Sequence, residues 1–263
     1  MKDLHFNYTM NLQFDEPVKQ HRFTLKCTPV SNNRQSISEL HIDVFPKEFL
    51  STYTDSFGNS CIYGYSEKEH RHFSIHVEGI AKTGLMPYEE TADEYKCNIY
   101  KYHTDYTKPG DNIIATYKNN FEHLSPCSNT DKTVAMMQYL YNHFEYVQGA
   151  TNIYTSAEEA FSLGKGVCQD YVHIMLPFCR MAGIPSRYVV GMLIGEGLSH
   201  AWIEILDHNR WIAFDPTNNL IVDDEHIKFS SGRDYKDCTI NQGIFTGNAQ
   251  QTQQVSVSVK EIY

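Results

Sequence analysis

The segment at residues 164–171 reads GKGVCQDY, a glycine-containing loop that leads into a helix. After Cys168, apolar residues recur at helical spacing. These residues are Val172, Met175, Leu176 and Cys179, and the stop signals Gly183 and Pro185 follow them. Pro177 should bend this helix without ending it, because the apolar spacing continues past it. Asp170 falls in the first turn, where a carboxylate interacts favourably with the helix dipole and could also position a loop.

The place of Cys168 at a helix start has a chemical consequence. A thiol there lies at the positive end of the helix dipole, beside N–H groups that have no partner within the helix. Both features favour the thiolate, which is the nucleophilic form of cysteine. The same N–H groups could stabilise an oxyanion on a carbonyl that the sulfur attacks. For a second oxyanion donor, Tyr146 and Thr151 are candidates.

A cysteine nucleophile needs a base, and the base needs a group that orients it. Two runs with period-two alternation, residues 199–206 and 211–215, indicate a pair of strands joined by a tight hairpin. A hairpin tip at 208–209 places Asp215 opposite Trp202 and diagonal to His200 on one face of the sheet. Diagonal neighbours lie about 7–8 Å apart, within reach of longer side chains. The hairpin therefore predicts a contact between His200 and Asp215.

These residues resemble the transglutaminase-like superfamily of papain-type cysteine enzymes, specifically the bacterial transglutaminase-like proteins. The resemblance runs from about Tyr146 to Tyr235. Its matching segments are GVCQD at 166–170, RMAGIPSRY at 180–188, SHAW at 199–202, FDPTN at 214–218 and GRDY at 232–235. It implies a nucleophile at Cys168, a general base and acid at His200 and an orienting carboxylate at Asp215. It also implies an α+β fold, with a papain-like core whose cysteine helix packs on an antiparallel sheet.

The N-terminal region looks like the β domain that precedes the catalytic core in bacterial members. Apolar and polar residues alternate in four runs, which begin near residues 4, 23, 40 and 73, and turn residues separate them. We expect a small all-β sandwich over residues 1–84 and a catalytic domain over 85–263, in which 85–128 serve as a connector. A helix should run from about Asp131 to before Gly149. A glutamine-rich patch at 250–254 precedes a final strand with Val255, Val257 and Val259.

Charge and hydropathy exclude several classes of protein. The 263 residues include 22 Lys and Arg against 32 Asp and Glu, a formal net charge of −10. Such an acidic chain lacks the charge to hold a phosphate backbone, so we expect no nucleic-acid partner. No run approaches the roughly 18 apolar residues of a membrane span, and the first seven residues contain no apolar signal segment. We expect a cytoplasmic protein without membrane contact.

The seven cysteines argue against a disulfide scaffold. They are scattered, odd in number and without any C-x-x-C pair, whereas a structural zinc site would show close pairs. Most should be buried thiols. We therefore expect no metal and no cofactor. Among the remaining residues, Trp202 is either a wall of the site or core, and Arg187 and Arg233 either bind a substrate carboxylate or pair with acidic residues, which we favour.

The sequence thus predicts a thiol enzyme that acts on amide bonds of a protein or peptide substrate through a Cys-His-Asp triad and a thioester acyl-enzyme. With water as acceptor it is a cysteine peptidase or amidase, the outcome we favour because bacterial relatives resemble peptidases. With an amine acceptor it is a protein-glutamine transglutaminase, and the same triad serves both. A non-catalytic binding module that retains the fold is the alternative from another class. A zinc-dependent hydrolase is disfavoured, because H-E-x-x-H and C-x-x-C spacings are missing.

Overall fold

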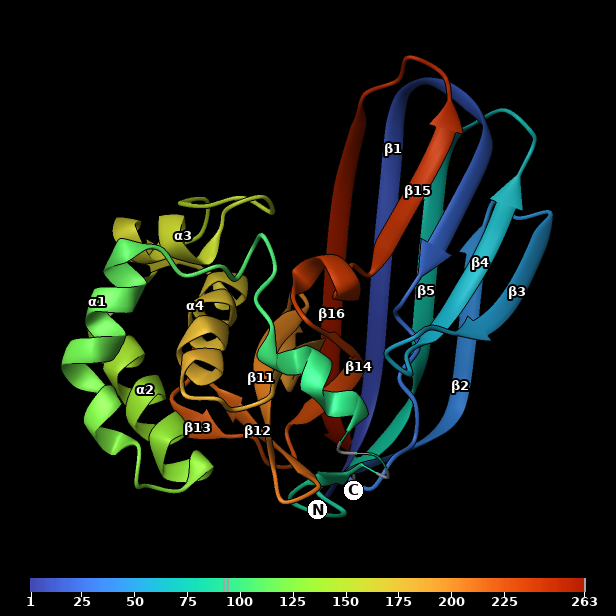
Figure 1. The fold of residues 1–263 in the computed structure, drawn as a ribbon. Helices are drawn as coiled ribbons and strands as arrows, with labels where there is room; N and C mark the ends of the chain where they lie inside the picture. The colour runs from blue at the N-terminus through green and yellow to red at the C-terminus, as the bar shows by residue number, and fades with distance from the viewer. Residues whose placement is uncertain (92, 94, 263) are drawn as a thin grey trace.

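The structure is a computed structural model that describes residues 1–91, 93 and 95–262. A sandwich of long strands lies beside a mixed part, in which helices cover a second sheet (Figure 1). The expected α+β architecture, a helix-bearing core preceded by an all-β region, is confirmed. In the described part of the chain, no helix is both long enough and apolar enough to span a membrane.

The sandwich is built around one long strand, β1 (Lys2–Leu25). Its first half pairs with β5 and β16, and its second half pairs with β4 and β15. The strand therefore belongs to both layers of the sandwich. The other strands of this part are β2 (Gln35–Phe45), β3 (Phe49–Thr54), β4 (Ser60–Ser66), β5 (His70–Thr83), β15 (Asn241–Thr246) and β16 (Gln251–Ile262). The short strand β10 (Gly195–Gly197) pairs with β16.

The apolar pattern of β1 changes phase where the strand passes between the layers. Every even-numbered residue from Leu4 to Phe14 is buried, whereas His21, Phe23 and Leu25 are the buried residues near the other end. Gln20 has a φ of 52°, and the pairing register shifts between Lys19 and Arg22 and, earlier in the strand, between Gln13 and Val18. An irregularity of this kind re-aims the following side chains. The strand can therefore keep its apolar face inside the sandwich along its whole length.

The mixed part is an antiparallel sheet covered by helices. Its strands are β6 (Glu89–Glu90), β9 (Ser186–Leu193), β11 (His200–Asp207), β12 (Arg210–Asp215), β13 (Leu220–Ile221) and β14 (His226–Gly232), and a separate pair is β7 (Glu145–Tyr146) with β8 (Lys165–Gly166). The helices are α1 (Asp111–Asn120), α2 (Asn129–His143), α3 (Ala157–Leu163) and α4 (Cys168–Met181), with 3-10 turns η1 (Lys96–Lys101), η2 (Glu122–Leu124) and η3 (Tyr235–Cys238). The expected helix near Asp131 and the cysteine helix are both present.

Helix α4 forms the centre of this part. Every residue from Asp170 to Arg180 is buried, more than the single apolar face that the spacing predicts. Other helices and the sheet enclose α4, and a helix that is apolar all round requires such a position. Pro177 lies inside the helix as expected, and Gly183, with a φ of 77°, follows its end.

The two parts are joined by segments that lie far apart in the sequence. Strand β10 pairs with β16 at Val257–Val259, and the ring of Tyr8 packs edge-on against Phe229 of β14 with centroids 5.6 Å apart. Strands β15 and β16, which the sequence analysis places within the 85–263 domain, pair with β1 in the sandwich. The division at residues 84 and 85 itself stays a prediction.

Candidate active site

A β-hairpin brings His200 and Asp215 together. Strands β11 and β12 pair with Ile203 opposite Phe214 and Asp207 opposite Arg210, so the hairpin tip lies at 208–209 as predicted. Positive φ values at these two tip residues give the strands the turn they need. His200 Nε2 lies 2.7 Å from Asp215 Oδ2. The predicted contact between these two side chains is therefore present.

Cys168 begins α4, and its surroundings hold that helix start in place. The Asp170 carboxylate accepts a hydrogen bond from the backbone N–H of Val167 at 2.7 Å, which closes a capping interaction. A side chain at Gly166 would bring its Cβ within 2.4 Å of the same carboxylate, so only glycine fits there. Cys168 is half-buried, whereas five of the other six cysteines are buried. The sulfur is thus both fixed and reachable.

The electrostatics couple Cys168, His200 and Asp215. Burial disfavours a charged His200 ring, but hydrogen bonds with Asp215 and Cys168 outweigh this effect and raise the pKa of His200 from 6.5 to about 10. Because Asp215 occupies Nε2, the ring nitrogen left for the sulfur is Nδ1. Burial also opposes ionisation of Asp215, but hydrogen bonds from His200 and His226 keep its pKa below the ordinary value. The arrangement favours an imidazolium held between a carboxylate and the sulfur.

Asp215 is fully buried and accepts more hydrogen bonds than the sequence suggests. Besides His200, its oxygens accept from the backbone of Thr217 and Asn218, from Asn218 Nδ2 at 2.7 Å and from His226 Nε2 at 3.1 Å. The sequence analysis missed His226. Asn218 lies in the FDPTN segment, which is a usable signal, but His226 begins another strand and its spacing gives no hint.

Among the residues that the structure describes, His200, Asp215 and His226 form a group of side chains that could hold a metal ion. Their ligand atoms lie within 4.8 Å of one another, and two histidines with a carboxylate are a ligand set that zinc accepts. The same atoms are engaged in the hydrogen bonds just described. A metal there would compete with the contact between His200 and Asp215.

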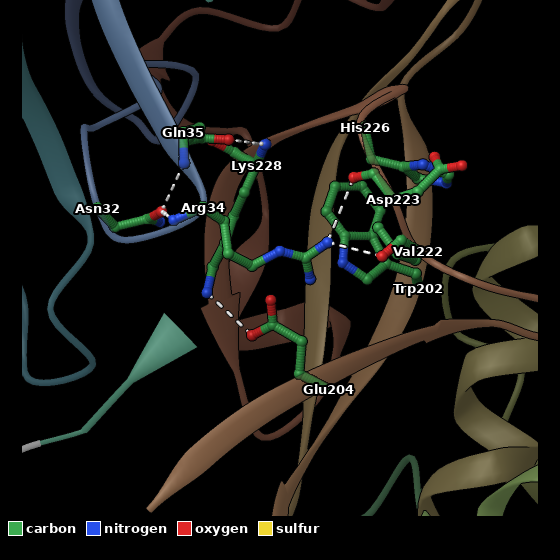
Figure 2. Close-up of a pocket in the computed structure, with 9 residues that line it drawn as sticks. All are labelled: Asn32, Arg34, Gln35, Trp202, Glu204, Val222, Asp223, His226 and Lys228. Atoms are coloured by element: carbon green, nitrogen blue, oxygen red, sulfur yellow. Dashed lines mark hydrogen bonds and ion pairs between the residues drawn. The ribbon is translucent and has the colours of Figure 1, made fainter. Parts of the chain in front are cut away.

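A small cavity lies beside His226, away from Cys168. Figure 2 shows Trp202 and His226 on one side of it and Arg34, which reaches over from the sandwich, on the other. Its volume of about 10 Å³ leaves room for one water at most. Trp202 is core that also walls the site, since it is 1% exposed and its ring centroid lies 6.3 Å from that of His200. This cavity is too small for a substrate.

A buried ionic network closes that side of the sheet. Arg187 Nε lies 2.6 Å from Glu204, and Lys228 Nζ lies 2.9 Å from Glu204 and 2.8 Å from Glu89. Arg233 likewise pairs with Asp237. The two arginines therefore pair with acidic residues, the interpretation that the sequence analysis favoured.

The larger hollow that Cys168 and His200 line is a groove of about 720 Å³, which has room for a substrate. We call it the long groove. It is lined by parts of segment 146–153, the start of α4, residues 198–201, residues 239–245 next to and within β15, and alternate residues of β1 and β16. A second hollow of about 270 Å³ shares Tyr146, Cys168 and His200 with it and follows β10. The sandwich and the mixed part therefore both contribute residues to the site.

The two candidate oxyanion donors differ in their contacts. Thr151 Oγ1 donates to Asp170 at 2.6 Å, which commits its hydroxyl hydrogen and ties the loop to the helix start. Tyr146 pairs through β7 with Gly166 of β8 and lines both hollows beside Cys168. Burial and the nearby Cys168 raise the pKa of Tyr146, which keeps its hydroxyl a donor. Tyr146 stays a candidate, whereas the Thr151 side chain acts on Asp170.

Comparisons with known proteins agree with this architecture. Residues 118–216 match the model of the transglutaminase-like superfamily, and residues 4–82 match that of the bacterial transglutaminase-like N-terminal region. An uncharacterized protein of Mycobacterium leprae is 26% identical over 269 residues, which cover 95% of each chain. An uncharacterized protein of Mycobacterium bovis is 32% identical over 137 residues, 46% of this chain and 44% of the other.

A solved structure shares the whole fold. The crystal structure of a Cytophaga hutchinsonii protein, described as a candidate cysteine protease, superposes with a TM-score of 0.81 at 21% identity. The match covers 100% of this chain and 91% of the other. The sandwich and the mixed part therefore occur together in another protein.

Proposed function

Because the chain belongs to the transglutaminase-like superfamily, we propose that it is a thiol enzyme that cleaves amide bonds as a cysteine peptidase or amidase. The observation that carries this proposal is the hydrogen-bonded series from Cys168 through His200 to the buried carboxylate of Asp215. The series stands at the long groove, which has room for a substrate. The three groups have the identities and order that nucleophile, base and orienting acid require.

The proposed reaction moves one proton through His200. The Cys168 thiolate attacks the carbonyl carbon of the amide, and the oxygen takes up negative charge beside the N–H groups that begin α4. His200, which holds the former thiol proton, gives it to the leaving nitrogen as the C–N bond breaks. A thioester and a free amine result. Water, which loses a proton to His200, then attacks the thioester, and the thiolate and a carboxylic acid are released.

Hydrolysis is the form that we favour over amine transfer. The solved structure with the same fold is described as a candidate cysteine protease, which supports a peptidase. A transglutaminase would use an amine in place of water at the second step, with the same triad. A non-catalytic binding module would have no need for a buried carboxylate held beneath a histidine that reaches a sulfur.

Selective alkylation tests the proposal, and Cys127 serves as an internal control. Cys127 is exposed, whereas Cys168 is half-buried, so access alone favours labelling of Cys127. At about pH 6 an ordinary thiol is almost wholly protonated and reacts slowly with iodoacetamide. We expect Cys168 to be labelled first, as measured by peptide mass mapping. Labelling of Cys168 no faster than Cys127 would contradict an activated nucleophile.

Turnover tests the same assignment independently. Cys168→Ala should abolish cleavage of a peptide pool without loss of folding, whereas the matched variant Cys127→Ala should cleave like the wild type. The pool is incubated with and without a labelled primary amine. Cleaved peptides alone indicate hydrolysis, and incorporation of the amine into glutamine side chains indicates the transglutaminase alternative. A Cys168→Ala variant that keeps most of the activity rejects the nucleophile.

A further inference from the structure

The long groove lacks formal charge. Among the residues that the structure describes, none of the 29 that line it is Asp, Glu, Lys or Arg, although these types make up 21% of the chain. The 22 Lys and Arg and the 32 Asp and Glu of the chain, which give it a net charge of −10, therefore lie outside the lining of the groove. His21 lines the groove, but burial lowers its pKa to about 4, which leaves it neutral near pH 7. His200 is balanced by Asp215.

The lining combines an apolar wall with amide side chains. On the inner face of the sandwich, Leu12 of β1 stands opposite Gln253 of β16, and Phe14 stands opposite Gln251. The glutamine-rich patch of the sequence thus supplies two of the amides. Asn241 also lines the groove, and its buried Oδ1 has no hydrogen-bond partner within the described residues. Amides of this kind can bind peptide N–H and C=O groups without charge.

The edge of β16 beside the groove is open. On one side β16 pairs with β1 from Gln251 to Ile262, but on the other side β10 covers it only at Val257–Val259. Within residues 1–91, 93 and 95–262, no strand pairs with the other edge of segment 251–256. Leu198 to His200 follow β10 directly and line both hollows. A strand added to the open edge would continue the line of β10 beyond Gly197 and start beside His200.

We propose that the long groove binds an extended, uncharged peptide segment, which adds to the open edge of β16 and presents its scissile amide to Cys168. This inference rests on the proposed function and names its substrate class. The open edge of segment 251–256 corresponds to about six residues of extended chain. A strand that pairs with a sheet edge gains its affinity from main-chain hydrogen bonds and its specificity from alternate side chains.

Charge exclusion follows from the same lining. A Lys, Arg, Asp or Glu side chain in the groove would lose its hydration and find no counter-ion there. Neutral side chains lose far less hydration free energy on entering the groove. The amide side chains of the lining can replace the water molecules that were bound to the backbone of the peptide. The groove therefore selects against charged segments more than it selects for one neutral sequence.

A charge swap on β16 tests the proposal. The wild-type chain is assayed on fluorogenic peptides with a neutral cleavable segment and on copies with one Lys or Glu at each position. We expect one charged residue at the alternate positions of the bound segment whose side chains face the groove to lower kcat/KM at least tenfold. Gln253→Glu should lower kcat/KM for the neutral peptide and raise the ratio of Lys-containing to neutral peptide at least tenfold. Gln13→Glu adds the same charge on the outer face of β1, where the side chain is exposed and does not line the groove, and it should stay within twofold of the wild type.

The strand pairing has its own readout. In a strand that joins an edge, only alternate backbone N–H groups face the partner. Peptides N-methylated in the two alternate patterns should therefore differ, with a loss of at least tenfold for one pattern only. Equal cleavage of charged and neutral peptides, equal effects of Gln253→Glu and Gln13→Glu, or equal effects of the two methylation patterns would each overturn the proposal.

A small substrate separates this inference from the proposed function. Hydrolysis of 4-nitrophenyl acetate needs the triad but not the long groove. If the ester is hydrolysed in a manner that depends on Cys168 while peptide charge makes no difference, the substrate class is wrong and the thiol enzyme stands. If neither the ester nor any peptide is hydrolysed, the proposed function and the substrate class fail together.

Discussion

Replacing Asp215 with asparagine tests the part of the proposed triad on which the state of His200 depends. In the wild type, both carboxylate oxygens accept hydrogen bonds, Oδ2 from His200 and Oδ1 from the backbone of Thr217 and Asn218. An asparagine amide has only one acceptor oxygen. In either orientation its NH₂ group therefore faces another donor, either the His200 ring or the backbone N–H groups of Thr217 and Asn218. With the amide N–H toward His200, the ring must carry its proton on Nδ1, and it can no longer take one from the sulfur.

The expected size of the effect follows from the histidine. Raising the pKa of His200 from 6.5 to about 10 corresponds to about 5 kcal/mol in favour of the imidazolium, at 1.36 kcal/mol for each pKa unit. Asp215 and Cys168 share this stabilisation, and burial opposes it. We therefore expect kcat/KM to fall by about 10²–10⁴-fold, at most the loss of about 10⁴ known for the equivalent change in a Ser-His-Asp triad. The assay is steady-state cleavage of the neutral peptide, and folding is followed by thermal unfolding.

The same substitution should change how activity depends on pH, and the pKa shifts also set how stability depends on pH. The leaving amine needs a protonated His200, so wild-type activity should fall on the alkaline side near pH 10, and Asp215→Asn should move that fall toward pH 6.5. The raised pKa of His200 stabilises the fold in full below about pH 6.5, and this contribution is lost as the pH rises toward 10. The lowered pKa of Asp215 stabilises it above the ordinary carboxyl range, and that contribution is lost as the pH falls.

A matched substitution controls for the loss of one negative charge. Asp223 is exposed and lies in the loop between β13 and β14, and Asp223→Asn should leave kcat/KM within twofold of the wild type. A folded Asp215→Asn variant that keeps more than a tenth of the wild-type kcat/KM, with an unchanged alkaline limb, would refute the reasoning.

Three further substitutions probe the contacts around the site. Micromolar Zn²⁺ should inhibit the enzyme by binding to the two histidines and to the carboxylate between them. His226→Phe should weaken this inhibition at least tenfold. Wild-type activity that is lost on addition of EDTA would instead favour a zinc hydrolase. Thr151→Val deletes the hydroxyl that donates to buried Asp170 and should cost about 1–2 kcal/mol in urea unfolding while lowering kcat/KM severalfold; no change in either speaks against the loop tie. Arg187→Met leaves Glu204 with one cationic partner and should lower the free energy of unfolding by about 3 kcal/mol, and a loss below about 0.5 kcal/mol would contradict a buried ion pair.

Local patterns predicted much of the site. The alternation of residues 199–206 and 211–215 and a two-residue turn fixed the hairpin register, and that register brings His200 to Asp215. The helix that begins at Cys168 followed from its apolar spacing and its stop signals. Both inferences use contacts between residues less than about twenty positions apart, where backbone geometry leaves few alternatives.

The contacts that escaped prediction join distant segments. His226 reaches Asp215 although β14 pairs with β9, on the opposite side from β11, and is no neighbour of β12 in the sheet. No spacing in the sequence specifies this order of strands. The alternation of β16 indicates a strand but names no partner, and its partner, β1, lies more than 200 positions away. Sheet pairing depends on which apolar faces meet in three dimensions, so such partners follow from packing rather than from local propensity.

The return of β16 to the sandwich explains why a β region accompanies this core. Helix α4 and the β11–β12 hairpin suffice to assemble Cys168, His200 and Asp215, yet they supply only part of the long groove. Residues of β1, β15 and β16 supply the remainder, and β10, which leads directly to His200, is hydrogen-bonded to β16. The strand that pairs with β10 is therefore the one that carries Gln251 and Gln253 into the groove. The proposed chemistry depends on the mixed part, whereas the proposed choice of substrate depends on the sandwich, so substitutions on the inner face of β16 should change specificity while the triad remains intact.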